Sequence, residues 1–388
     1  MRKNFFKKNI KELVKRIRIF YTVYYFIGTT FINILKLFIK TDNYLILFVS
    51  FGGRYMNDSP KMIYDAMILD ERFTKYKLVW AFTEPKTYDN VFKVKIDSLR
   101  YYITALKARC WITNVMIERA LGFKGKNTFY FHTTHGTLPK LTGNHVKQKH
   151  IFYSKHPFQF DLSCAQSHIE AQLQEEMYNL TPEKIIISGY PKNDALCNKS
   201  DKYIKNIRVK FNISDEKYVI LYAPTFREKI SNNTEKINFN KWKKILGNDF
   251  IVLLRTHPVY SENYVFNDLD GFIIDVSKYP DNNDLMIASD LLISDYSAII
   301  FEYVVLNKPV LCFAYDYDDY IKTRGLYFDV RDEIFGGHLN EEELLEYIRN
   351  KDFNESMKKT LELRKKYVSE YGHATKICVD AIYEQIKE

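Results

Sequence analysis

Short apolar runs rich in β-branched and aromatic residues alternate with helical stretches along this chain, and this alternation constrains the fold more than any other feature. The first series of runs lies at residues 44–53, 76–81, 108–114 and 128–134, with helical stretches at 60–69 and 97–107. The second lies at 217–225, 249–258, 271–277, 290–297 and 308–316, with helical stretches near 238–246, 282–289 and 297–306. Alternating strands and helices predict a parallel sheet covered by helices on both faces.

The two series predict two α/β domains, because 388 residues exceed what one hydrophobic core usually organises. We expect a basic, aromatic segment at 1–40, Rossmann-like domains at 41–205 and 206–370, and a C-terminal helix at 371–388 that crosses back to the first domain. The boundary is placed in the polar, charged stretch at residues 195–215. Two such sheets facing each other leave a cleft at the carboxyl ends of their strands, where ligands of open α/β sheets bind.

Positive charge is concentrated at the N-terminus. Residues 1–18 hold eight of the 57 Lys and Arg residues but one of the 48 acidic residues, so the remaining 370 residues carry 49 basic and 47 acidic side chains. A nearly neutral body without a basic, aromatic motif argues against a nucleic-acid partner. The five cysteines are scattered and form no C-x-x-C pair, a pattern that favours neither a disulfide framework nor a zinc site.

An uncharged, aromatic-rich segment follows the basic stretch at residues 19–35. Its length is at the short edge of what spans a bilayer, and threonine, glycine and asparagine dilute its apolar character. A cationic stretch before aromatic residues favours a helix that lies in an anionic headgroup layer. A true membrane span and ordinary packing against the core are the alternatives, whereas the lack of a small-residue cleavage site after Leu35 disfavours a secretory signal.

The segment 290–303 combines a buried strand with the start of a helix. The strand ends at Ser294 and Asp295, and Ser297 stands where a helix N-cap residue is expected. Backbone N–H groups at a helix start, together with the helix dipole, bind pyrophosphate groups. Glu302 follows closely enough to reach a ribose hydroxyl. The alternative is a capping serine without a ligand.

Two histidines stand at the ends of predicted strands and are followed at once by turn residues. They are His135 and His257. This position places each imidazole at the sheet edge that faces the cleft, where a near-neutral pKa suits proton transfer or contact with phosphate. The alternative for each is a structural histidine.

Seven segments of the chain carry a family resemblance. They are FVSFGGRYMNDSP at 48–60, HGTLPKLTG at 135–143, ISGYPKNDAL at 187–196, LYAPTFRE at 221–228, LLRTHP at 253–258, the run 275–320 and RGLYFD at 324–329. In this order they resemble the CDP-glycerol glycerophosphotransferase family, the teichoic acid primases and polymerases of Gram-positive cell walls. The resemblance covers about residues 44–385.

The resemblance implies a GT-B-like pair of facing Rossmann-like domains, the first binding the acceptor and the second the nucleotide donor. It also implies an enzyme that moves glycerol or ribitol phosphate from CDP-glycerol or CDP-ribitol to a hydroxyl of an acceptor carried on undecaprenyl pyrophosphate, with release of CMP. The product is wall teichoic acid or a related capsule, made by a peripheral protein at the cytoplasmic face of the cell membrane. The CDP-polyol is a substrate, and no cofactor or metal is expected.

The resemblance also assigns roles by position. The catalytic residues it implies are His135, matched to the family's proposed base, and His257, matched to its second active-site histidine. The candidate donor-binding residues are Arg255, Asp295, Ser297, Glu302 and Arg324. The candidate residues of the acceptor loop are Gly136, Thr137 and Lys140.

Some positions depart from the family pattern. After His135 the chain reads Gly-Thr-Leu-Pro-Lys where the family usually reads Gly-Thr-Pro-Leu-Lys, Ala298 replaces a usual serine, and Glu302 stands where an aspartate is more typical. Two rival functions remain open at this point. They are a glycosyltransferase of the same architecture that uses a nucleotide sugar, and a non-catalytic membrane-associated scaffold.

Overall fold

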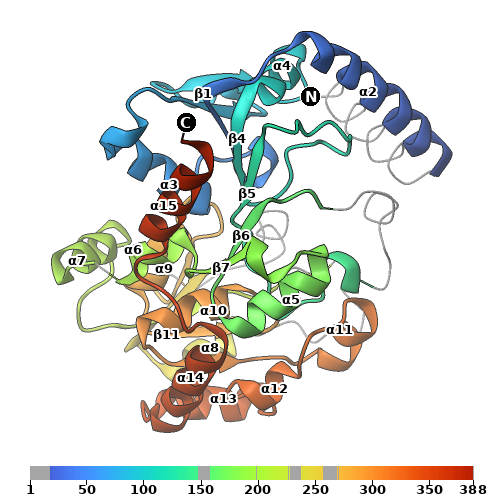
Figure 1. Cartoon of the computed structure of the whole chain (residues 1–388). Coiled ribbons are helices and arrows are strands. Elements are labelled where there is room, and N and C mark those ends of the chain that lie inside the picture. Colours follow the sequence, from blue (N-terminus) through green and yellow to red (C-terminus); the bar gives the residue numbers. More distant parts are fainter. Residues whose placement is uncertain are drawn as a thin grey trace, which may run out of the picture. The chain divides into compact units, whose positions relative to one another are not determined.

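The computed structural model describes residues 18–146, 158–197, 199–225, 227, 237–256, 269 and 271–387 (Figure 1). The chain forms two compact units, each built on a parallel sheet. Unit 1 consists of Met1–His135, Thr142–Lys192 and His373–Glu388, and unit 2 consists of Gly136–Leu141 and Asn193–Gly372. The predicted α/β class with parallel sheets is confirmed.

Unit 1 contains a sheet of seven described strands in the order β3-β2-β1-β4-β5-β6-β7, and every neighbouring pair is parallel. The strands are β1 (Asp42–Val49), β2 (Lys77–Phe82), β3 (Phe92–Lys95), β4 (Ala108–Thr113), β5 (Phe129–His132), β6 (Leu162–Ala165) and β7 (Ile185–Ile187). The helices are α2 (Arg18–Phe38), α3 (Asp58–Leu69), α4 (Leu99–Lys107), α5 (His168–Tyr178) and α15 (Ala374–Ile386). Five consecutive residues of β1 and all but one residue of β4 are buried, and strands with such continuous burial need helices on both faces of the sheet.

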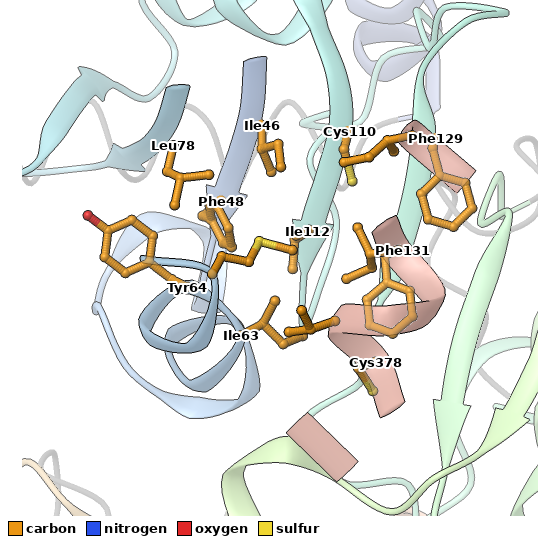
Figure 2. Close-up of a cluster of buried hydrophobic side chains, with 14 of the residues drawn as sticks. Ile46, Phe48, Ile63, Tyr64, Leu78, Cys110, Ile112, Phe129, Phe131 and Cys378 are labelled. Carbon is orange, nitrogen blue, oxygen red and sulfur yellow. The ribbon is translucent and has the colours of Figure 1, made fainter. Parts of the chain in front are cut away.

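The core of unit 1 includes residues from the far C-terminus of the chain. Cys378 and Ile382 of α15 are fully buried in the same cluster as Ile63 of α3 and Phe131 of β5. Figure 2 shows Cys378 and Phe131 on the same side of the sheet as Ile63. The C-terminal helix therefore completes the first unit.

Unit 2 repeats this design with a five-stranded parallel sheet in the order β10-β9-β8-β11-β12. Its strands are β8 (Tyr218–Tyr222), β9 (Phe250–Leu254), β10 (Ile273–Asp275), β11 (Leu291–Ser294) and β12 (Val310–Cys312). Its helices are α6 (Asp194–Cys197), α7 (Asp201–Lys210), α8 (Phe239–Leu246), α9 (Asn282–Ala288), α10 (Ile299–Tyr303), α11 (Tyr317–Thr323), α12 (Val330–Glu333), α13 (Glu341–Arg349) and α14 (Asn354–Tyr367). Trp242 of α8 and Leu345 of α13 lie in its core.

Each sheet has one point at which the strand order reverses, between β1 and β4 in unit 1 and between β8 and β11 in unit 2. At such a point the loops leaving two adjacent strands run to opposite sides, which opens a crevice beyond the carboxyl ends of the strands. The residues that directly follow these four strands are therefore candidates for a functional site.

The structure differs from the sequence-based expectation in several places. The first sheet contains three strands that were not predicted, β3, β6 and β7. In the second sheet, by contrast, all five predicted runs form strands. The change from unit 1 to unit 2 falls between Lys192 and Asn193, ahead of the predicted boundary at 205, and residues 136–141 belong to unit 2 although they follow a strand of unit 1. The strands β3, β6 and β7 were missed because each has only three or four residues, which is too short a run to give a periodic signal.

Residues 19–35 lie within the helix α2, which packs on the loop at 119–124 through polar contacts. Tyr21 and Tyr24 donate hydrogen bonds to the carbonyl oxygens of Ala120 and Arg119, and Asn33 donates to that of Gly122. The opposite side of α2 exposes large apolar side chains, namely Ile19, Phe20, Val23, Phe26, Ile27, Phe31, Ile34, Leu37 and Phe38. Across the part of the chain that the structure describes, we find no helix with the length and apolar character needed to cross a bilayer. The basic stretch at 1–17 lies outside the described residues.

Candidate active site

The strand edge of unit 1 is closed by a hydrogen bond between the two segments that leave it. Phe51 follows β1 and Asn114 follows β4, and the backbone N–H of Phe51 donates to the side-chain oxygen of Asn114 at 2.8 Å. Asn114 is fully buried, so this bond replaces the water that its amide oxygen would otherwise need. The bond thus ties the segment after β1 to the segment after β4.

His135 is held by its ring beside the segment after β4. Its Nδ1 lies 2.9 Å from the backbone oxygen of Asn114, and its ring meets the ring of Phe51 edge-on with centroids 5.7 Å apart. A carbonyl oxygen only accepts hydrogen bonds, so Nδ1 carries the proton and Nε2 keeps a lone pair. His135 is exposed, so an imidazole oriented as a base is accessible to a substrate.

The backbone around His135 is held by Lys192. The ammonium group of Lys192 donates to the carbonyl oxygen of His135 at 3.2 Å and lies 3.4 Å from a carboxylate oxygen of Asp58. Both side chains are more than nine-tenths buried. Thr134, the residue before His135, has a φ of 48°, a conformation that a β-branched residue adopts only when its surroundings enforce it. Three of the seven motif segments therefore meet at His135.

The neighbouring His132 has a different environment. Its ring stacks on Phe160 with a centroid distance of 4.0 Å and an interplanar angle of 4°, and it is 3% exposed. Burial, with a smaller contribution from His135, lowers the pKa of His132 to about 3. His132 is therefore a neutral core residue at physiological pH, and His135 is the histidine suited to proton transfer.

The strand edge of unit 2 is organised around Asp295, which directly follows β11. One carboxylate oxygen accepts from the backbone N–H of Thr225 at 2.8 Å, and the other accepts from the guanidinium of Arg227 at 2.8 Å. Asp295 is 1% exposed. Its described contacts hold the chain that leaves β8 and position Arg227.

Arg227 is held by two carboxylates and two aromatic rings. It forms ion pairs with Asp295 and Asp316, and its guanidinium lies over the stacked rings of Tyr296 and Tyr320 at 5.0 and 5.1 Å. Burial opposes its charge, but the two carboxylates outweigh burial and raise the pKa of Arg227 above its usual range. Arg227 lies within one of the seven motif segments, but no role was predicted for it. Its position directly after an Ala-Pro-Thr turn at a strand end was the available signal.

The expected N-cap position of Ser297 is wrong by one residue. The N-cap of α10 is Ala298, whose backbone is already helical, while the hydroxyl of Ser297 accepts a hydrogen bond from the N–H of Ile299 at 3.4 Å. The helix itself has five residues before a 3-10 turn at Val304–Leu306. Such a short helix has few aligned peptide dipoles, so cationic side chains are needed beside it to bind a diphosphate.

The loop at residues 136–141 packs on the start of α10 within unit 2. A Cβ atom on Gly136 would lie 2.6 Å from the Cβ of Ala298 and 3.9 Å from a carboxylate oxygen of Glu302, which is 7% exposed. Glu302 therefore borders the 136–141 loop. The contact between Glu302 and a ribose hydroxyl, expected from the sequence, stays a prediction.

The same loop pairs with the segment that contains Arg324. Lys140 and Leu326 form an antiparallel bridge, flanked by hydrogen bonds from Leu141 N–H to the Gly325 oxygen at 3.2 Å and from Tyr327 N–H to the Pro139 oxygen at 2.9 Å. Thr137, in the same loop, is buried. The predicted acceptor-loop residues Gly136, Thr137 and Lys140 thus belong to unit 2.

The remaining predicted site residues are Arg255, Arg324 and His257. The guanidinium of Arg255 donates from Nη1 to the carbonyl oxygens of Val276, Ser277 and Tyr279 at 2.7, 3.1 and 2.5 Å, so its described contacts anchor the loop after β10. Arg324 follows α11 and is exposed. His257 lies outside the described residues, and its role stays a prediction.

The sequence profile of the CDP-Glycerol:Poly(glycerophosphate) glycerophosphotransferase family matches residues 31–384. The chain belongs to this family. A relative in this family is the teichoic acid poly(glycerol phosphate) polymerase of Staphylococcus epidermidis, which is 33% identical over 322 residues that make up 76% of this chain and 44% of that protein. Another is the teichoic acid glycerol-phosphate transferase of Staphylococcus aureus, 30% identical over 85% of this chain and 86% of that protein. The chain thus spans less than half of the first relative and most of the second.

Solved structures of this family have the same architecture. The wall teichoic acid polymerase TagF, in a histidine-to-asparagine variant soaked with CDPG for 15 minutes, is similar with a TM-score of 0.82 and 27% identity, covering 98% of this chain and 96% of that one. A UDP-N-acetylglucosamine 2-epimerase bound to UDP-GlcNAc, from Neisseria meningitidis, shares the fold at a TM-score of 0.53 and 16% identity.

Proposed function

We propose that this protein transfers glycerol or ribitol phosphate from a CDP-activated donor to a hydroxyl of a lipid-linked acceptor, with release of CMP. The observation that carries the proposal is the position of the 136–141 loop. Gly136 packs against the start of α10, beside the Asp295 and Arg227 ion pair, and His135 precedes Gly136 by one peptide bond. Family membership supplies the donor class, because the family is defined by CDP-glycerol.

The proposed chemistry begins at the imidazole of His135. Its Nε2 takes the proton of the acceptor hydroxyl as that oxygen attacks the phosphorus that bears the polyol. A new oxygen–phosphorus bond forms, the bond to the bridging oxygen of the diphosphate breaks, and CMP leaves with the electron pair. The charge on the leaving group requires cationic partners. Arg324 is one candidate, and His257 is a second.

The test uses the full chain with a synthetic lipid-linked acceptor and CDP-glycerol or CDP-ribitol. We expect CMP release that depends on the acceptor, and products that are heavier by whole polyol phosphate units in mass spectra. Release of UDP from a nucleotide sugar instead would favour a glycosyltransferase. A folded protein that turns over neither class of donor would favour the scaffold.

We also propose that α2 docks the protein on the cytoplasmic face of the cell membrane as a peripheral protein. Along α2 the polar side chains point to the 119–124 loop while Phe26, Ile27 and Phe38 are 69%, 62% and 82% exposed. This reverses the usual arrangement, in which the apolar face of a surface helix is buried. An apolar face of this size beside a cationic stretch suits an anionic lipid surface, where the lipid-linked acceptor would reside.

Sedimentation with vesicles that contain phosphatidylglycerol tests this docking. The double variant Phe26→Asp and Ile27→Asp should lose most of its vesicle binding. Leu69→Asp is the matched control, because Leu69 is 85% exposed at the end of α3 and away from α2 in sequence. Equal binding by wild type and double variant would argue against α2 as the docking element.

A further inference from the structure

Lys140 lies in the loop at residues 136–141, which belongs to unit 2 and pairs with the segment after Arg324. It was predicted to belong to an acceptor loop, but the groups whose charges act on it are Asp295, Arg324 and Arg227, all in unit 2. The antiparallel bridge to Leu326 fixes the backbone of Lys140 beside the segment that begins at Arg324. The 136–141 loop thus places the Lys140 ammonium group near the carboxyl end of β11. Open α/β sheets bind nucleotides at this edge.

We propose that Lys140 binds the pyrophosphate of the donor rather than the acceptor, an inference that rests on the proposed function. Within this cluster Arg227 pairs with both Asp295 and Asp316. Lys140 and Arg324 are the two further cations. An ammonium group acts as a compact point charge for phosphate, whereas Arg227 is held in a fixed geometry by its carboxylates.

Further charged groups act on Lys140 or border its loop. A partly buried ammonium group near two guanidinium groups is destabilised unless negative charge compensates it. Asp295 supplies some of that charge, although it is shared with Arg227. Glu302 borders the loop at its other end, near Gly136, and Tyr320 lies under Arg227.

This arrangement makes donor binding depend on pH. Burial lowers the pKa of Lys140 to about 8, with Asp295 acting in the opposite direction and Arg324 and Arg227 acting in the same direction. A bound diphosphate favours the protonated lysine and so raises its pKa. Donor affinity should therefore be constant well below pH 8 and fall as pH rises above 8, because the free lysine must then take up a proton on binding.

The experiment is calorimetric titration of the full chain with CDP-glycerol and CDP-ribitol, without acceptor, between pH 6.5 and 9.5 in two buffers of different ionisation enthalpy. Wild type should show proton uptake and a Kd that rises by up to about tenfold per pH unit above pH 8. Lys140→Arg should bind without this dependence, because arginine stays charged throughout. Lys140→Met should weaken binding at pH 7 by roughly tenfold or more.

Lys322→Met serves as the matched control, because Lys322 lies on α11 in the same unit and its side chain is 72% exposed. Its donor affinity should equal that of wild type. A Lys140→Met protein with normal donor Kd and a raised KM for the acceptor would overturn the inference, as would a Lys140→Arg protein that keeps the pH dependence of wild type. If wild type itself binds neither CDP-polyol, the proposed function fails as well, and the wild-type titration alone reveals this outcome.

Discussion

The Nδ1 atom of His135 lies 2.9 Å from the backbone oxygen of Asn114, the residue that directly follows β4. The tautomer of the candidate base is therefore set by the segment that leaves β4. Because the partner is a backbone carbonyl, no substitution of the Asn114 side chain removes it directly, and the ring orientation depends on the local fold.

Replacing His135 should lower turnover without changing the affinity for the donor. His135→Gln should lower turnover by roughly 10²-fold or more, because glutamine cannot accept the proton of the acceptor hydroxyl. The Kd for CDP-glycerol should change little, because the proposed donor contacts lie in unit 2. Steady-state CMP release and calorimetry measure the two quantities. Near-normal turnover in a protein with an unchanged melting temperature would remove His135 from the role of base.

The buried pair of Asp58 and Lys192 should contribute to stability as well as to the position of His135. Asp58→Asn leaves the buried ammonium group without its carboxylate, and we expect a loss of about 3 kcal/mol in the free energy of unfolding. Asp65→Asn is the matched control on the same helix, because the Lys61–Asp65 pair is partly exposed and should contribute less than about 1 kcal/mol. Urea denaturation distinguishes the two. Equal losses in both variants would contradict the argument.

Gly136 should tolerate no side chain. Gly136→Ala places a Cβ 2.6 Å from the Cβ of Ala298 at a φ of +117°, so the 136–141 loop must move and turnover should fall. Gly247→Ala is the control, because Gly247 has a φ of +75° but no atom within 4 Å of its added Cβ, so this variant should show only a backbone cost of about 1–3 kcal/mol and no loss of turnover. Adding Ala298→Gly to Gly136→Ala should restore part of the lost activity. Failure of this rescue would assign the whole effect to backbone strain.

Acid should destabilise the protein through His132. Its folded pKa of about 3 lies below its ordinary value of 6.5, so the unfolded state binds the proton more tightly and stability falls as pH decreases from about 6.5 toward 3. The expected slope from this residue is about 1.4 kcal/mol per pH unit. His132→Phe keeps an aromatic ring against Phe160 and removes the titrating group, so its unfolding free energy should vary less between pH 7 and pH 5. An unchanged pH dependence would show that His132 is not the group that titrates.

The site could be predicted in part from local patterns. His135, Asp295 and Ser297 follow apolar runs that end in turn residues, and such runs indicate strand ends through their local composition alone. The N-cap assignment at Ser297 failed by one residue because helix boundaries depend on backbone geometry that composition does not specify. Asn114 and Lys192 were missed because nothing in their local sequence shows that they meet His135.

The sequence by itself determined the alternation of strands and helices, the two series of runs, and the residues that stand at their ends, because hydrophobic periodicity is a local property of the chain. Only the tertiary structure decided that α15 completes the core of unit 1 and that the 136–141 loop joins unit 2, placing Lys140 beside Asp295. These contacts join residues far apart in the chain. They arise from the packing of whole elements, and no local pattern encodes that packing.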